Sequence, residues 1–147
     1  MGSGFRKTDL PSEIEGVVHQ VIGAAIEVHR ELGPGLLESI YEQALLYELQ
    51  LRNIQASQQV ETDVMYKDTV IKGQRLDLLV ENQVVIELKS VTQVLDIHKA
   101  QLLSYLRAGN FPVGLLINFN VKLVRDGITR VFNERSLPPS SPSRASR

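Results

Sequence analysis

Two acidic residues and a lysine lie close together in the segment RLDLLVENQVVIELKS, residues 75–90. Asp77 precedes Glu87 by ten positions, and Lys89 follows Glu87 with one residue between them. Because alternate residues of a strand share a face, Glu87 and Lys89 are predicted to point together, away from the core. Two carboxylates and an ammonium on one face can hold a metal ion, position a water molecule and offset charge on a phosphate. The segment therefore predicts a site for phosphodiester hydrolysis.

A hairpin with its turn centred on Asn82 would bring the two acids together. In that register Asp77 faces Glu87, and facing residues of an antiparallel pair have Cβ atoms about 4.5–5.5 Å apart. Like charges directly opposite each other destabilise a sheet, so a bound divalent cation is the simplest compensation. The pattern is short, however, and it leaves open a second interpretation. In that interpretation the three residues form a solvated ion-pair cluster on an exposed strand face.

The elements that must position these residues follow from the periodicity of apolar side chains. Helical spacing predicts one helix from about Glu13 to the Gly33-Pro34-Gly35 break and a second that ends near Arg52. Two-residue alternation and apolar runs predict strands and one more helix, in the order 60–66, 70–80, 84–90, helix 97–108, 113–119 and 128–132. The order α-α-β-β-β-α-β-β predicts an α/β fold with a mixed β-sheet flanked by helices.

Local signals predict where the helices begin and which faces they bury. Ser12 and Glu15 have the spacing of a capping box, and Asp96 is expected to cap the third helix. The buried stripe of the second helix is expected to contain Leu37, Ile40, Tyr41, Ala44 and Leu45.

Composition limits the class of protein. The 147 residues suit one domain, with 1–12 a short flexible N-terminus, 13–135 the folded domain and 136–147 a disordered tail rich in Ser and Pro. No apolar stretch resembles a signal peptide or a membrane span, and there is no cysteine, which suits a cytoplasmic location. A net charge of −1 argues against a broad phosphate-binding surface but permits a local basic rim.

The D…ExK pattern on a hairpin followed by a helix resembles the PD-(D/E)XK, restriction-endonuclease-like, nuclease superfamily. The segment GLLESIY, residues 35–41, is further similar to the signature of the GxxExxY protein family. The similarity runs from about Glu13 to Asn133 and includes GPGLLESIYE, RLDLLVEN, VIELKSV and LINF. The proline of the superfamily's name is absent, because Arg75-Leu76 precedes Asp77. That position varies across the superfamily, so the resemblance is little affected.

The resemblance implies metal ligands and a catalytic lysine. Asp77 and Glu87 would bind Mg²⁺ or Mn²⁺, with the backbone carbonyl of Leu88 as a third ligand. Lys89 would orient or activate the attacking water and stabilise the charged transition state. Glu38 would complete the site from the second helix, although an acid in a first helical turn equally suits the helix macrodipole.

Residues of the helices would support this site. Gln101 and Tyr105 match a QxxxY motif that follows ExK in RecB-like nucleases, although Tyr105 on spacing alone also suits a boundary aromatic. Tyr41 shares a helical face with Glu38 and is a candidate supporting residue. His98 lies near the predicted site in sequence and is a candidate phosphate contact, whereas isolated histidines more often occupy surface or boundary positions.

These features together predict a metal-dependent nuclease that cleaves nucleic acid, DNA rather than RNA, and that forms a homodimer if both strands of a duplex are cut. One alternative is a non-catalytic module with the same fold that binds nucleic acid or a protein partner. Another is a structural protein that dimerises through its helical pair.

Overall fold

The computed structural model describes residues 10–137. The helices are α1 (Ser12–Leu32), α2 (Glu38–Leu51) and α3 (Asp96–Gly109), and the strands are β1 (Ala56–Tyr66), β2 (Thr69–Val80), β3 (Val84–Lys89), β4 (Val113–Asn118) and β5 (Ile128–Phe132). Two short 3-10 helices, η2 (Val124–Gly127) and η3 (Glu134–Ser136), flank β5. The predicted element order and the α/β class are confirmed. The predicted flexible start and disordered tail fall largely on residues 1–9 and 138–147, which lie outside the described residues, and the domain bounds stay predictions.

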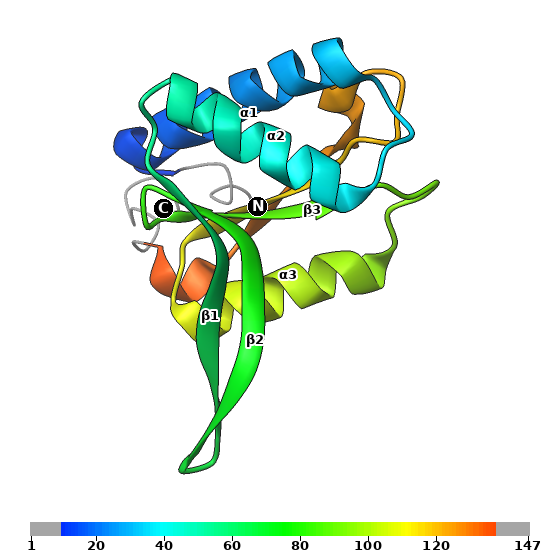
Figure 1. The fold of residues 1–147 in the computed structure, drawn as a ribbon. Coiled ribbons are helices and arrows are strands. Elements are labelled where there is room, and N and C mark those ends of the chain that lie inside the picture. Colours follow the sequence, from blue (N-terminus) through cyan, green and yellow to red (C-terminus); the bar gives the residue numbers. More distant parts are fainter. Residues whose placement is uncertain (1–9, 138–147) are drawn as a thin grey trace, which may run out of the picture.

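The five strands form one mixed sheet in the order β1-β2-β3-β4-β5. β1, β2 and β3 are joined antiparallel, β3 and β4 run parallel across the α3 crossover, and β5 is antiparallel to β4. Figure 1 shows α1 and α2 over one face of the sheet and α3 over the other, while the far part of the β1–β2 hairpin extends away from the helices. None of the helices within residues 10–137 has the length and apolar character needed to cross a bilayer.

Each face of the sheet carries its own apolar cluster. Under α1 and α2 the sheet contributes Leu78, Val80, Val84, Ile86, Leu88, Val113, Leu115 and Ile117. On the α3 side the buried set is smaller, with Leu76, Leu79, Val85, Leu102, Leu106 and Leu116. The continuous apolar run of β4 is therefore explained, because that strand is buried on both faces.

The start of α1 differs from its prediction. No side chain caps the helix, Pro11 occupies the N-cap position, and Ser12 is already helical. The carboxylate of Glu15 does not reach back to the helix start, because it accepts two hydrogen bonds of 2.9 Å from the guanidinium of Arg130 on β5. The predicted capping box is thus wrong, and a bidentate ion pair between elements 115 residues apart takes its place.

The buried stripe of α2 is also narrower than predicted. Tyr41, Leu45 and Leu49 are fully buried, whereas Leu37 is 73% and Ile40 43% exposed. The ring of Tyr41 stacks on Phe119 with centroids 4.4 Å apart. Its hydroxyl donates to the carbonyl of Gly33 and accepts from the N–H of Leu36 at 3.2 Å. Tyr41 therefore fixes the loop that leads into α2, and this leaves the first turn of α2 at the surface.

Removing only the hydroxyl of Tyr41 tests this anchor. We expect Tyr41→Phe to lower the free energy of unfolding by about 1–3 kcal/mol, because two backbone groups lose their partner while the ring stacking remains. Urea unfolding followed by circular dichroism measures the change. Tyr47→Phe on the same helix is the control, since Tyr47 is 62% exposed and should change stability by less than about 0.5 kcal/mol. Equal stability of both variants would contradict the anchoring role.

Candidate active site

The candidate site lies where β2 separates from β3. The turn at residues 81–83 follows the prediction: Glu81 and Asn82 both have positive φ, and the N–H of Gln83 donates to the carbonyl of Val80 at 3.0 Å. Val80 pairs with Val84, as predicted, and the ladder continues to the pair Leu78 and Ile86, where it ends. Beyond this fork β2 stays paired with β1 as a two-stranded hairpin. Asp77, which precedes Leu78, is the first residue of β2 that is not paired with β3.

The carboxylate of Asp77 replaces the missing ladder partner of β3. Its Oδ2 accepts a hydrogen bond of 2.9 Å from the N–H of Leu88. The ladder between β1 and β2 is also interrupted here. Gln58 pairs with Leu78 and Val60 with Leu76, but the two residues between these pairs, Gln59 (φ 53°) and Asp77, are not paired. Asp77 thus occupies a gap in both neighbouring ladders. A buried backbone N–H must find an acceptor, and the side chain of Asp77 supplies it.

Glu87, which follows Ile86, is the first residue of β3 that is not paired with β2. Its environment is unfavourable for a charge. The side chain is largely buried, and its Oε1 has no hydrogen-bond partner among the described residues. Burial first, and then the neighbouring charge of Asp77, raises the pKa of Glu87 to about 8. Burial also raises the pKa of Asp77, although the hydrogen bond from Leu88 opposes the shift. These two acids therefore share a poorly solvated site.

Lys89 is the cation of the cluster. It follows Glu87 by two residues on β3, and its charge lowers the pKa values of both Asp77 and Glu87. For each acid, burial raises the pKa by more than the charge of Lys89 lowers it. The backbone carbonyl of Lys89 accepts from the N–H of Phe119 at 3.0 Å, which anchors the end of β3. One ammonium does not neutralise the acids around it.

Helix α2 adds two more acids, of which the sequence predicted only Glu38. Glu38 is exposed in the first turn, and its charge raises the pKa values of Asp77 and Glu87. Glu42, one turn further on, was missed. Burial, and then the charge of Asp77, raises the pKa of Glu42, while hydrogen bonds from Gln59 (3.0 and 3.2 Å) oppose the shift. The i, i+4 spacing of the two glutamates was the available signal.

The predicted supporting residues lie in different positions relative to the acids. Tyr105 on α3 lies near the acids, because burial and then the charges of Glu87 and Asp77 raise its pKa. Gln101 is exposed one turn before it. Tyr41 is fully buried, and its hydroxyl holds the loop before Glu38. His98 caps α3: its Nδ1 accepts from the N–H of Leu95 at 3.0 Å, in place of the cap predicted from Asp96.

Two hydrogen-bond groups hold the helices and strand ends around the cluster. The hydroxyl of Ser90 donates to the carbonyl of Leu36 at 2.6 Å, which joins the end of β3 to the loop before Glu38. The buried amide of Asn118 accepts from the N–H of Val91 at 3.1 Å and donates to its carbonyl at 3.0 Å. Sequence reasoning noted LINF only as part of a motif. These contacts fix the segment that follows Lys89.

The fit to a divalent metal rests on the donor set. Mg²⁺ takes oxygen ligands, commonly one or two carboxylates completed by water and phosphate. The unpartnered Oε1 of Glu87 beside Asp77 meets that requirement. Within residues 10–137, no three His, Asp or Glu side chains are grouped closely enough to hold a metal ion as they stand. A ligand role for the exposed Glu38 therefore requires its side chain to turn inward.

With this geometry in hand, comparison with known proteins assigns the family. The family model described as the PD-(D/E)XK nuclease superfamily matches residues 15–131, and the chain belongs to that superfamily. The narrower GxxExxY resemblance stays a prediction. No curated protein sequence matches the chain significantly. A crystal structure of the protein SSO0001 aligns with 26% identity over 73% of this chain and 53% of its own, about half its length, at a TM-score of 0.46.

The raised pKa of Glu87 makes stability depend on pH. Between pH 4.5 and about 8 the folded protein keeps a proton that the unfolded chain releases. The free energy of unfolding should therefore fall as pH rises through this interval, by up to ~1.4 kcal/mol per pH unit. Glu87→Gln should flatten this dependence and be more stable than the wild type at pH 9. Urea unfolding in EDTA at pH 5, 7 and 9 measures both.

Asp68→Asn is the charge-matched control, because Asp68 is exposed in the turn between β1 and β2, at the end of the hairpin far from the fork. It should keep the pH dependence of the wild type. Some dependence should remain in Glu87→Gln, since the pKa values of Asp77 and Glu42 are also raised. If Glu87→Gln is less stable than the wild type at pH 9, the carboxylate is favourably placed in the fold, and our account of the site is wrong.

Proposed function

We propose that this protein is a divalent-metal-dependent nuclease that hydrolyses phosphodiester bonds, with DNA preferred over RNA and Mg²⁺ or Mn²⁺ as the cofactor. The observation that carries the proposal is the buried, unpartnered carboxylate of Glu87 beside Asp77. Strongly shifted titratable groups gather at functional sites more often than elsewhere. Membership of a nuclease superfamily gives the chemistry.

The residues of the fork would divide the work as follows. Asp77 and Glu87 would hold the ion, with the backbone carbonyl of Leu88 and the side chain of Glu38 as further ligands. A divalent ion in such a site polarises the phosphate and lowers the pKa of a nearby water. Lys89 would position that water and offset negative charge that develops on the phosphate. Glu42 would hold Gln59 against the edge of the site through the hydrogen bonds described above.

The other candidate residues would act around this centre. Tyr105 is within electrostatic range of both strand acids, so it is suited to support the substrate, with Gln101 one turn away on α3. His98 is better suited to hold the start of α3 than to contact phosphate, because its Nδ1 is occupied. Cutting both strands of a duplex would require two copies of a site this small, so we retain a homodimer as part of the proposal. The cytoplasm stays the predicted compartment.

The first test is cleavage. Wild-type protein is incubated with labelled single-stranded and duplex DNA and RNA, in Mg²⁺, in Mn²⁺ and in EDTA, and products are resolved on a denaturing gel. We expect cleavage only with a metal ion. Asp77→Asn, Glu87→Gln and Lys89→Met should each lower the rate at least about 100-fold, because each removes charge needed in the transition state. Asp68→Asn, exposed in the far turn of the β1–β2 hairpin, should cleave at the wild-type rate.

The outcome also separates the proposal from its alternative. If the wild type cleaves nothing under any condition while binding the same oligonucleotides, the protein is a non-catalytic module. Cleavage at equal rates by the wild type and the three site variants would show that the fork is not the catalytic centre.

A second test distinguishes the two glutamates of α2. We expect Glu42→Gln to reduce cleavage about tenfold or less, because an amide can still bond Gln59 and only its charge is lost. Glu38→Gln should instead raise the Mg²⁺ concentration needed for half-maximal rate, since it would remove a ligand. Titration of the rate with Mg²⁺ for both variants makes this measurement. An unchanged Mg²⁺ requirement in Glu38→Gln would exclude Glu38 from the ligand set.

A further inference from the structure

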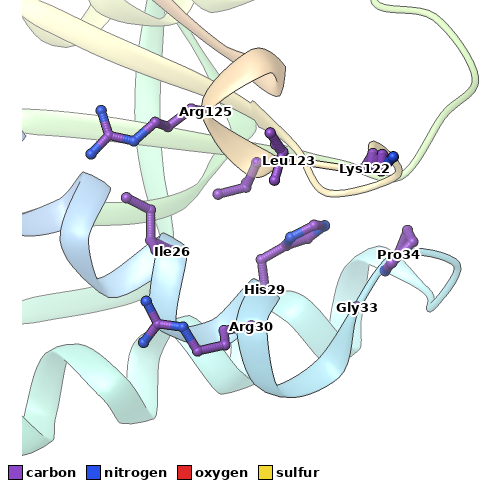
Figure 2. Close-up of a pocket in the computed structure, with 9 residues that line it drawn as sticks. Ile26, His29, Arg30, Gly33, Pro34, Lys122, Leu123 and Arg125 are labelled. Carbon is purple, nitrogen blue, oxygen red and sulfur yellow. The ribbon is translucent and has the colours of Figure 1, made fainter.

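A cavity of about 510 Å³ lies between α1 and the segment that leads into η2. Ile26, Arg30 and the loop residue Pro34 line one wall, and Lys122, Leu123 and Arg125 line the other. Figure 2 shows the two guanidinium groups at one end, on either side of Ile26, and Lys122 at the other end near Pro34. The acids of the fork are not among the lining residues.

The lining combines positive charge with an apolar surface. Three of its side chains are cationic, and neither Asp nor Glu lines the cavity within the described part of the chain. Arg30 is partly offset, because its Nη1 donates to Glu27 at 2.7 Å. The side chain of Leu123 is 62% exposed at the mouth. An occupant with negative charge at both ends and a flat or apolar centre is therefore favoured.

The two walls are joined by a buried polar contact. His29 is only 7% exposed, and its Nε2 lies 3.1 Å from the carbonyl oxygen of Phe119 and 2.9 Å from that of Val121. Because both carbonyls can only accept, Nε2 carries the proton. This forked hydrogen bond ties α1 to the segment that carries Lys122. The two walls of the cavity are thus held together by a buried contact of the fold.

We infer that this cavity binds one nucleotide unit of a nucleic-acid strand. A nucleotide within a strand has a phosphate on either side of its sugar and base, which matches cations at both ends of an apolar floor. A fatty acid or other anion with a single charged group would use one end only. The inference rests on the proposed nuclease function and gives its substrate a second contact outside the fork.

The covalent path from the cavity to the acids is short. Gly33 and Pro34, which form part of the wall, lead through Leu36 into the first turn of α2. The hydroxyl of Tyr41 holds Gly33, and that of Ser90 holds Leu36 at the end of β3. One loop therefore borders the cavity and positions Glu38, so a strand bound in the cavity lies next to the element that carries this acid.

The test is binding in EDTA, where the proposed cleavage cannot occur. The probe is a fluorescein-labelled dT12 oligonucleotide, measured by anisotropy from 50 to 200 mM salt. We expect Lys122→Ala/Arg125→Ala to weaken binding about tenfold and to reduce the salt dependence, because phosphate contacts are lost. Leu123→Ser should weaken binding without altering the salt dependence, since it removes only apolar contact. Thermal unfolding of each variant checks that the fold is intact.

Lys99→Ala/Arg107→Ala is the charge-matched control, because these two exposed residues of α3 line a different cavity, against β5. It should keep most of the affinity. Equal losses in the two double variants would mean that only total charge matters, and would overturn the inference. So would displacement of dT12 by thymidine monophosphate at matched concentration, which indicates a free nucleotide, or by a poly-glutamate peptide, which indicates a protein partner.

The binding test of the cavity and the cleavage test of the proposed nuclease function can fail independently of each other. Loss of dT12 binding in the cavity variants, with no cleavage by any form of the protein in Mg²⁺ or Mn²⁺, would support the cavity and contradict the nuclease proposal. Metal-dependent cleavage by the wild type, with cavity variants that bind dT12 as tightly as the wild type does, would support the nuclease proposal and overturn the cavity.

Discussion

The hydrogen bond between the N–H of Leu88 and the carboxylate of Asp77 is the constraint on which the site depends. The β2–β3 ladder ends at Leu78 and Ile86, and the next N–H of β3 that needs an acceptor receives one from a side chain. This contact holds Asp77 against β3 although the two backbones have separated. It also brings one acid beside Glu87, which the fold has already buried. The geometry of the fork thus forces two carboxylates together.

Such an arrangement has a cost in stability that the fold does not itself offset. Glu87 loses solvation and gains a like-charged neighbour, while Lys89 compensates only in part. The acids of α2 add to the same negative field. Elsewhere local pattern and global fold agree, with apolar residues on both covered faces of the sheet. A place where charge, burial and hydrogen bonding conflict is typical of a functional site, where binding of a counter-charge resolves the conflict.

Sequence reasoning recovered whatever local periodicity and turn chemistry determine. The element order, the turn at Asn82 and the pairing of Val80 with Val84 all follow from alternation and one short connection. It failed where a distant partner decides. Glu15 turns to Arg130 instead of capping α1, and the face of α2 was misjudged because Tyr41 stacks on a residue of the β4–β5 connection. Glu42 was missed although its i, i+4 spacing from Glu38 was visible, because only tertiary packing brings Gln59 to it.

The near-zero net charge is reconciled with a nucleic-acid substrate by where the charges lie. Seventeen acids and sixteen basic residues nearly cancel in the sum. In space they separate: four acids gather at the fork, whereas the cavity beside α1 is lined by three cations and by neither Asp nor Glu among the described residues. A divalent ion at the fork would offset most of the negative charge there, and the cavity would offer a strand a second, positively charged contact. Net charge alone therefore cannot exclude a polyanionic substrate, because it averages over this separation.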